Sequence, residues 1–262
     1  MIIGGFAGAI SRTLTAPFEL GKIQQQNTYM PYTSLRDVFK KEGVLGLWKG
    51  NFSNCIRIFP QMAVNYTVFK YSQNILTAYI ENTAFKNFIA GSIAGMVAMS
   101  LIYPLENARS RLSLQTNKDH YKGLIDIFRK TPTLNLYNGL KMSLIGYTPY
   151  TALSFMFYHK YKELLTNYNL NSHLISILSG GLSGMSAVTF TYPTDLIRRR
   201  LQLQDFDSKV PKYNGIIDCI KKIYYKEGLP GLYRGLGMCY IKIFPAVAIQ
   251  FWVMEFGKEL FY

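Results

Sequence analysis

The chain is poor in the residues that build chemical centres in soluble enzymes. Its 262 residues include only three cysteines and three histidines. The cysteines are far apart and lack the spacing of a metal site or a disulfide framework: Cys55, Cys219 and Cys239. The histidines form no cluster either: His120, His159 and His173. We therefore expect reduced, small apolar cysteines, no metal ion and no cofactor. We also expect no enzymatic activity, since no set of nucleophile, base and orienting group is present.

Charged residues are scarce too, at 17% of the chain, whereas 49% of it is apolar. A soluble domain usually carries about 25% charged residues. Six mostly apolar segments exceed the roughly 20 residues that a helix needs to cross a bilayer: 1–26, 51–73, 85–112, 141–164, 173–203 and 238–260. The mean hydropathy is only +0.05, because most of these segments also contain Gly, Pro, Ser, Asn or a charge. We expect six membrane helices around a wet central path; a soluble all-helical solenoid is the alternative, which the long apolar segments disfavour.

Acidic residues are outnumbered by basic ones, 15 to 29, which gives a net charge of +14. Nucleic-acid binding would require a basic stripe with a reading motif, and the sequence contains none. The bases gather in the three longer connections between apolar segments, and such asymmetry orients a membrane protein. The excess charge therefore favours anionic lipid outside and an anionic solute inside.

One motif occurs three times at nearly equal spacing, which marks an internal repeat. In each copy a proline is followed by an acid two residues later and by a base five residues later. The copies are Pro17-Phe18-Glu19-Leu20-Gly21-Lys22, Pro104-Leu105-Glu106-Asn107-Ala108-Arg109 and Pro193-Thr194-Asp195-Leu196-Ile197-Arg198. A proline inside a helix removes a hydrogen bond and kinks the helix. We expect each kink to turn its acid and base toward a pseudo-threefold axis.

Glycines and basic turns repeat along with the prolines. Small residues four apart, which let membrane helices pack closely, precede each proline: Gly4 and Gly8, Gly91 and Gly95, Gly180 and Gly184. A short basic helix and an aromatic–basic–glycine step follow each proline: Trp48-Lys49-Gly50 and Tyr233-Arg234-Gly235, with Tyr137-Asn138-Gly139 in the second repeat. A helix start beside a base binds phosphate. We therefore expect a lipid head group such as cardiolipin at these steps, with partner turns at Gly123 and Gly215. An ordinary loop turn is the alternative.

These features together resemble the mitochondrial carrier family across essentially the whole chain. The family motif is Pro-x-acid-x-x-base-x-base, followed further on by acid-Gly and aromatic-base-Gly. The second base is present as Arg111 and Arg200, and acid-Gly as Glu42-Gly43 and Glu227-Gly228. The chain departs from the pattern where Gln24 replaces the second base of the first repeat and where Thr131-Pro132 replaces acid-Gly in the second.

The resemblance implies an all-α membrane protein, a single carrier domain over 1–262. Its six transmembrane helices would form three pseudo-threefold repeats, 1–80, 81–168 and 169–262, each with a short matrix-side helix. It implies a monomeric transporter of the mitochondrial inner membrane whose central site opens alternately to each side. Three ion pairs would close the matrix side: Glu19 with Arg109, Glu106 with Arg198, and Asp195 with Lys22. Gln26 and Gln202 would brace them; Ser113, at the equivalent place in the second repeat, is not expected to.

The equivalent gate on the cytoplasmic side is weaker in this sequence. By resemblance it involves Lys70 and Gln73, His159 and Lys162, and Glu255 and Lys258. Lys162 with Glu255 is the one strong pair, Gln73 with His159 is at best a hydrogen bond, and Lys70 faces Lys258. We expect the resting carrier to be open toward the cytoplasm.

The solute site is expected on a polar stripe of the segment 51–73. Its members lie three or four residues apart, on one helical face: Asn54, Arg57, Gln61 and Asn65. Helix–helix hydrogen bonding is the alternative for Asn54, whereas Arg57 would then be a buried unpaired charge. By resemblance Arg57, Gly146-Tyr147 and Lys242 fall at the three substrate contact points, and Arg12 adds another base.

Three bases with no acid expected beside them suit an anion of several charges, and phosphates suit Arg and Lys. Tyr147 and Tyr150 either offer aromatic faces to a base ring or pack structurally. The segment 241–246 resembles carriers of ATP-Mg/phosphate or coenzyme A. We predict exchange of nucleotide-like phosphorylated anions, of the ATP, ADP, dNTP or coenzyme A type. Carriage of thiamine pyrophosphate or inorganic phosphate, or a passive proton or ion leak, is the alternative.

Overall fold

The computed structural model describes residues 2–27, 29, 35–115, 121–168, 170–206 and 210–261; the side chains of 2–4, 6 and 250–261 are outside this description. All regular structure in these ranges is helical. The long helices are α1 (Ile2–Leu14), α2 (Ala16–Gln26), α4 (Asn51–Leu76), α5 (Thr83–Leu114), α8 (Leu140–Thr166), α9 (Ser172–Leu203) and α11 (Leu236–Phe261). The short ones are α3 (Leu35–Glu42), the 3₁₀ helix η1 (Val44–Trp48), α6 (Leu124–Lys130), α7 (Thr133–Leu136) and α10 (Ile216–Gly231). The predicted all-α fold is confirmed.

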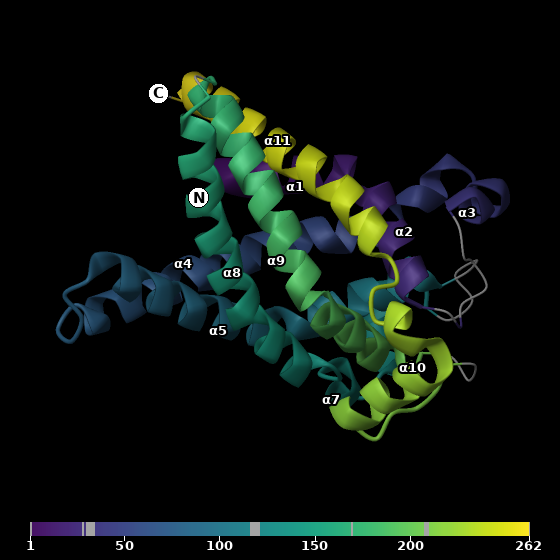
Figure 1. Cartoon of the computed structure of the whole chain (residues 1–262). Coiled ribbons are helices and arrows are strands. Elements are labelled where there is room, and N and C mark those ends of the chain that lie inside the picture. Colours follow the sequence, from purple (N-terminus) through teal and green to yellow (C-terminus); the bar gives the residue numbers. More distant parts are fainter. Residues whose placement is uncertain are drawn as a thin grey trace.

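The long helices form a ring in which the second helix of each repeat packs against the first helix of the next repeat. α4 packs along α5, α8 packs along α9, and α11 packs along α1 (Figure 1). α3, α7 and α10 lie toward one end of the bundle, which we call the short-helix end. The connection between α8 and α9 and the C-terminus lie at the other end, and the hairpin of α4 and α5 diverges from α8, α9 and α11.

The three motif prolines have two different effects on the first helix of each repeat. Pro17 follows a break at Thr15 that separates α1 from α2. Pro104 and Pro193 lie inside the continuous helices α5 and α9. Those two helices begin at asparagine caps, in which Asn82 accepts from the N–H of Phe85 and Asn171 from that of His173.

The glycine pattern brings the two helices of a repeat together. A Cβ atom on Gly5 would lie 2.7 Å from the Phe59 ring of α4. Gly95 and Gly181 are covered in the same way by Tyr147 of α8 and Phe244 of α11. These contacts support a packing role for the glycines in all three repeats.

Large apolar side chains on the outside of the bundle mark the surface that faces lipid. They include Leu14, Leu101, Ile145 and Phe190, each more than half exposed. By length and hydropathy α5 and α9 each qualify as a membrane span, and α10 and α11, bent by 67°, qualify together. Helix α4 does not qualify on hydropathy, because it carries the polar stripe from Asn54 to Asn65.

Candidate functional site

Three ion pairs close the short-helix end of the central path. Lys22 Nζ lies 2.7 Å from Asp195, Arg198 Nη2 lies 3.1 Å from Glu106, and Arg109 Nη2 lies 3.5 Å from Glu19. The pairs join α2, α5 and α9, which contribute one acid and one base each. Every partner is the one that the family resemblance implied.

The two glutamines near this ring have different hydrogen-bond partners. The Gln26 amide donates to the Asp195 carboxylate at 3.1 Å and to the Tyr192 hydroxyl at 3.1 Å, so it braces the pair between Asp195 and Lys22. Gln202 instead donates to the Tyr103 hydroxyl at 3.0 Å and accepts from Ser110 and Arg199. It therefore braces the neighbouring polar layer rather than an ion pair.

The expectation that the cavity bases have no acid beside them is wrong. Arg57 Nη1 lies 3.0 Å from Glu106, and Lys242 Nζ lies 2.5 Å from Glu19. The gate acids thus also contact bases of the cavity, which the motif did not suggest. Arg12 donates to the side-chain oxygen of Asn54 at 3.1 Å, so Asn54 joins helices as well as facing the cavity.

A cavity of about 230 Å³, which we call the basic basin, surrounds these groups. Seven of its lining side chains are basic and two are acidic: Arg12, Lys22, Arg57, Arg109, Arg198, Arg199 and Lys242, with Glu19 and Glu106. This excess of buried positive charge favours the binding of anions in the basin.

Arg199 is a basin residue that the sequence motif did not identify. Its guanidinium donates to Gln202 Oε1 at 2.9 Å and to the Ser110 hydroxyl. It makes no ion pair with a carboxylate of the described residues, although its exposed fraction is only 3%. The motif passes over this position, which lies between its two bases. The signal that would have found Arg199 is its place one helical turn after Asp195.

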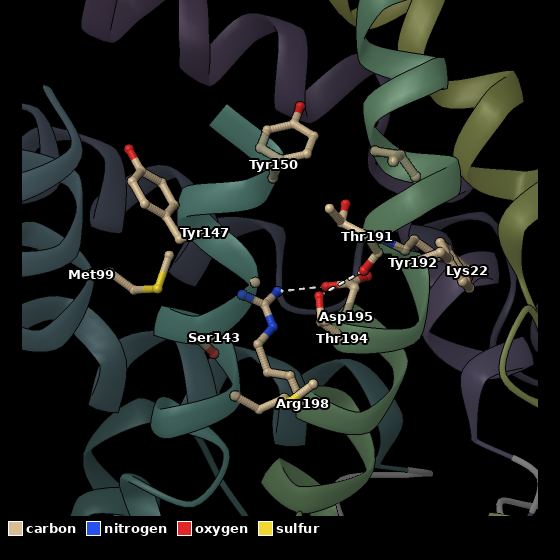
Figure 2. Close-up of a pocket in the computed structure, with 13 residues that line it drawn as sticks. Lys22, Met99, Ser143, Tyr147, Tyr150, Thr191, Tyr192, Thr194, Asp195 and Arg198 are labelled. Carbon is tan, nitrogen blue, oxygen red and sulfur yellow. Dashed lines mark hydrogen bonds and ion pairs between the residues drawn. The ribbon is translucent and has the colours of Figure 1, made fainter. Parts of the chain in front are cut away.

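An apolar, aromatic pocket of about 210 Å³ adjoins the basin (Figure 2). Tyr147 and Tyr150 of α8 line it, and Met99 of α5 lies beside Tyr147. Gly146 backs onto Thr194, so the absence of a side chain lets α8 approach α9 there. Lys22 and Arg198 line both the pocket and the basin, so the two spaces are neighbours.

The remaining stripe residues face the path above the basin. Gln61 and Asn65 line a cavity of about 280 Å³ together with Arg12 and Lys242. Asn65, Tyr147 and Tyr150 also line a larger cavity of about 1040 Å³ between α4, α5, α8, α9 and α11. The predicted solute residues therefore line neighbouring cavities that share lining residues.

Comparison with known proteins agrees with this geometry. The family described as mitochondrial carrier protein matches in three successive copies, over residues 1–79, 81–169 and 171–262. The chain belongs to the mitochondrial carrier family. Members of this family are transporters and not enzymes. The family predicted from the sequence and the prediction that the protein is not an enzyme are therefore both confirmed.

Individual relatives match nearly the whole carrier. Solute carrier family 25 member 16 of Bos taurus is 33% identical over 100% of this chain and 88% of its own length. The mitochondrial adenine nucleotide transporter ADNT1 of Arabidopsis thaliana is 32% identical over 99% of this chain and 86% of its own. The mitochondrial adenyl nucleotide antiporter SLC25A24 of Oryctolagus cuniculus is 33% identical over 99% of this chain and 57% of its own.

The residues expected at the cytoplasmic gate do not meet one another within the described part of the carrier. Lys70, His159 and Lys162 are exposed, and the side chains of Glu255 and Lys258 lie outside the described residues. Gln73, expected opposite His159, instead donates to Asn87 at 2.8 Å. His159 packs its ring against Phe155, 4.4 Å between centroids.

The expected lipid-binding steps are only partly free for a ligand. Gly50, Gly139 and Gly235 all begin second helices in the left-handed region, at φ of 76°, 88° and 86°. The Lys49 ammonium pairs with Glu42 and donates to the Gln115 carbonyl at 2.9 Å. Arg234 also pairs with Glu227, at 3.1 Å, but its side chain is 46% exposed.

The partner turns at Gly123 and Gly215 are stabilised by the same kind of hydrogen bond, from a backbone N–H to an aspartate. Asp126 accepts from the Lys122 N–H and Asp218 accepts from the Asn214 N–H, each at 2.9 Å. The hydrogen bonds from the Lys130 side chain and from the Lys122 N–H hold the pKa of Asp126 below its ordinary value. Both turns leave open space beside the glycine.

Proposed function

We propose that the carrier exchanges nucleotide-like phosphorylated anions across the mitochondrial inner membrane by alternating access. The observation that carries the proposal is that the basic basin and the aromatic pocket are neighbouring spaces lined in common by Lys22 and Arg198. A nucleotide combines the same two features, an anionic phosphate chain and a planar base.

The basin supplies the chemistry that binds phosphate. Arg12, Arg57 and Lys242 lie on three different helices and present donors to one space. Arginine and lysine form strong charge-assisted hydrogen bonds with phosphate oxygens. In the proposed complex the phosphates occupy the basin and displace part of the internal ion pairing.

The aromatic pocket supplies a place for the base. Tyr147 and Tyr150 offer ring faces to a planar heterocycle, and Thr191 and Thr194 offer hydroxyls at the pocket wall. The distance between phosphate and base is short, because Arg198 lines both spaces. Two of the relatives are named as adenine or adenyl nucleotide transporters, which also favours this class of solute.

Alternating access follows from the unequal ends of the path. The ring of ion pairs blocks the short-helix end, while the cavity of about 1040 Å³ widens at the other. In the proposed orientation the closed end faces the matrix. The exposed Arg234 turn remains our candidate contact for cardiolipin at that surface, and the carrier works as a monomer with one central path.

The test is counter-exchange in liposomes loaded with unlabelled solute. Labelled ATP, ADP, dATP, coenzyme A and thiamine pyrophosphate are offered to the wild type and to Arg57→Ala. Loss of a charge-assisted contact costs about 1.5–3 kcal/mol, so we expect roughly a tenfold or larger loss of apparent nucleotide affinity. Arg57→Lys should keep an intermediate affinity.

Arg129→Ala, a change at an exposed base of α6, serves as the control and should leave exchange unchanged. Unchanged nucleotide uptake in Arg57→Ala would contradict the assignment of the basin. Uptake of none of the five solutes by the wild type, or net flux without any solute to exchange, would contradict the proposed function itself.

A further inference from the structure

Two of the three gate carboxylates divide their oxygens between a gate base and a cavity base. Glu19 binds Arg109 through Oε1 and Lys242 through Oε2. Glu106 binds Arg198 through Oε1 and Arg57 through Oε2. We call Glu19 and Glu106 the bridging carboxylates.

The third gate carboxylate is different. Asp195 binds Lys22 at 2.7 Å and Arg198 at 3.0 Å, and both of these bases belong to the gate motif. The place opposite, at Gly146 and Tyr147, offers it no base. Asp195 therefore holds the gate without occupying a solute-binding group.

Each bridge is largely buried. The side chains of Arg57, Glu19 and Glu106 are between 10% and 13% exposed. A buried charge must be paired, and in the empty carrier the bridging carboxylates take the place that a solute phosphate would take. A phosphate can reach Arg57 or Lys242 fully only by displacing Glu106 or Glu19.

We propose that Glu19 and Glu106 are internal competitors that set the charge of the solute the carrier accepts. This inference rests on the proposed function, since it assigns Arg57 and Lys242 to solute phosphate. A singly or doubly charged anion replaces at most one bridge, so it gains little over the carboxylate it displaces. A chain of two or three phosphates spans both bases and replaces both bridges at once.

Displacement also changes the gate. The bridge from Lys242 ties α11 to α2, and the bridge from Arg57 ties α4 to α5. When phosphate takes both bases, each carboxylate keeps only its gate partner, and two links beside the ring are lost.

The test compares three inorganic probes, orthophosphate, pyrophosphate and tripolyphosphate, by titration calorimetry on the full chain in detergent. In the wild type we expect tripolyphosphate to bind about tenfold more tightly than orthophosphate, because it replaces two bridges and orthophosphate at most one. In Glu19→Gln or Glu106→Gln, orthophosphate should gain about tenfold in affinity, because one competitor is lost. Tripolyphosphate should gain by a similar factor, since it is relieved of the same competitor.

Asp195→Asn is the matched control, since it removes a gate carboxylate and one negative charge without freeing Arg57 or Lys242. Its orthophosphate affinity should stay within about threefold of the wild type. Thermal unfolding without ligand establishes that each variant is folded, and either glutamate variant alone suffices for the comparison. An orthophosphate affinity that is unchanged in the glutamate variants, or that rises equally in Asp195→Asn, would overturn the proposal.

Failure of the proposed function gives a different pattern. Nucleotide exchange together with no effect of the bridging carboxylates would leave the function and remove this inference. The predicted phosphate affinities without any nucleotide exchange would retain the internal competition and change the solute.

Discussion

Arg199 shows how much of the site depends on single residues outside the repeated motif. A buried charge without an opposite charge is costly, and Arg199 is held by a hydroxyl and an amide rather than by a carboxylate. Its neighbours on the motif, Arg198 and Arg200, both have acidic partners. Arg199, like Arg12, is therefore a basin guanidinium that can gain an opposite charge from an incoming phosphate.

Replacing Arg199 should weaken solute binding more than it weakens the fold. We expect Arg199→Gln to lower apparent nucleotide affinity roughly tenfold, or about 1.5 kcal/mol, because one charge-assisted contact is lost. Liposome exchange measures this as a higher KM. Arg199→Lys should recover part of the loss, and the exposed Arg129→Gln should match the wild type. A lower unfolding temperature with an unchanged KM would instead assign Arg199 a purely structural role.

At the scale of the element, the second and third repeats build the same corner with different chemistry. In the third repeat Arg200 binds Glu227 through both carboxylate oxygens, at 2.8 and 3.0 Å. The second repeat has no acid at the corresponding place. There Arg111 donates to Asn107 at 2.9 Å, and Asn107 in turn donates to the carbonyls of Asn135 and Leu136.

This corner could be predicted where the motif is intact and not where it departs. Pairing of Arg200 with Glu227 follows from a base and an acid at the places where the family has them. The replacement of acid-Gly by Thr131-Pro132 signalled a change, but not which group would satisfy Arg111. Asn107 lies between Glu106 and Arg109, inside the proline motif of the second repeat. The groups to which it donates are backbone carbonyls, which no pattern of side chains encodes.

The starts of the second helices make close contacts between repeats. A Cβ atom on Gly139 would lie 2.8 Å from the Arg198 carbonyl and 2.8 Å from the Tyr103 hydroxyl. Gly235 meets the Lys22 carbonyl in the same way, at 3.1 Å. Glycine at these positions is required both by space and by positive φ.

Alanine at two glycines should therefore have opposite effects. We expect Gly139→Ala to destabilise the carrier by about 1–3 kcal/mol, because left-handed backbone and a close contact are both strained by a side chain. Gly237, in α11, has open space around it and no positive φ. Gly237→Ala should stabilise by about 0.5–1 kcal/mol. Thermal unfolding in detergent measures both, and equal shifts would contradict the packing described for Gly139.

At the scale of the whole molecule, the carrier is closed at one end and open at the other. The closed end agrees with the sequence, in which all three acid–base pairs are complete. The bridges from Arg57 and Lys242 could not be predicted, because the sequence does not show how far the cavity bases reach along the axis. The length of these side chains lets them meet acids that belong to the gate.

The open end predicts which positions a reagent in the cytoplasm can reach. Ser154 lines the cavity of about 1040 Å³, whereas Ser179 is fully buried in α9. In a parent that lacks the half-buried Cys55, we expect Ser154→Cys to react with a membrane-impermeant maleimide at least about tenfold faster than Ser179→Cys. The reason is that the reagent can reach residue 154 in the open cavity but not residue 179 in the protein interior. Comparable rates in the absence of solute would show that the resting carrier is closed on this side.

The excess of bases in the basin has an electrical consequence for the exchange. These charges are fixed to the protein and return to their starting place with every cycle. The net charge moved is therefore only the difference between the solute carried in and the solute carried out. An exchange of solutes that differ by one negative charge moves one elementary charge across the membrane. A membrane potential of about 100 mV favours one direction of that exchange by about 2.3 kcal/mol, which is roughly fiftyfold in the equilibrium ratio.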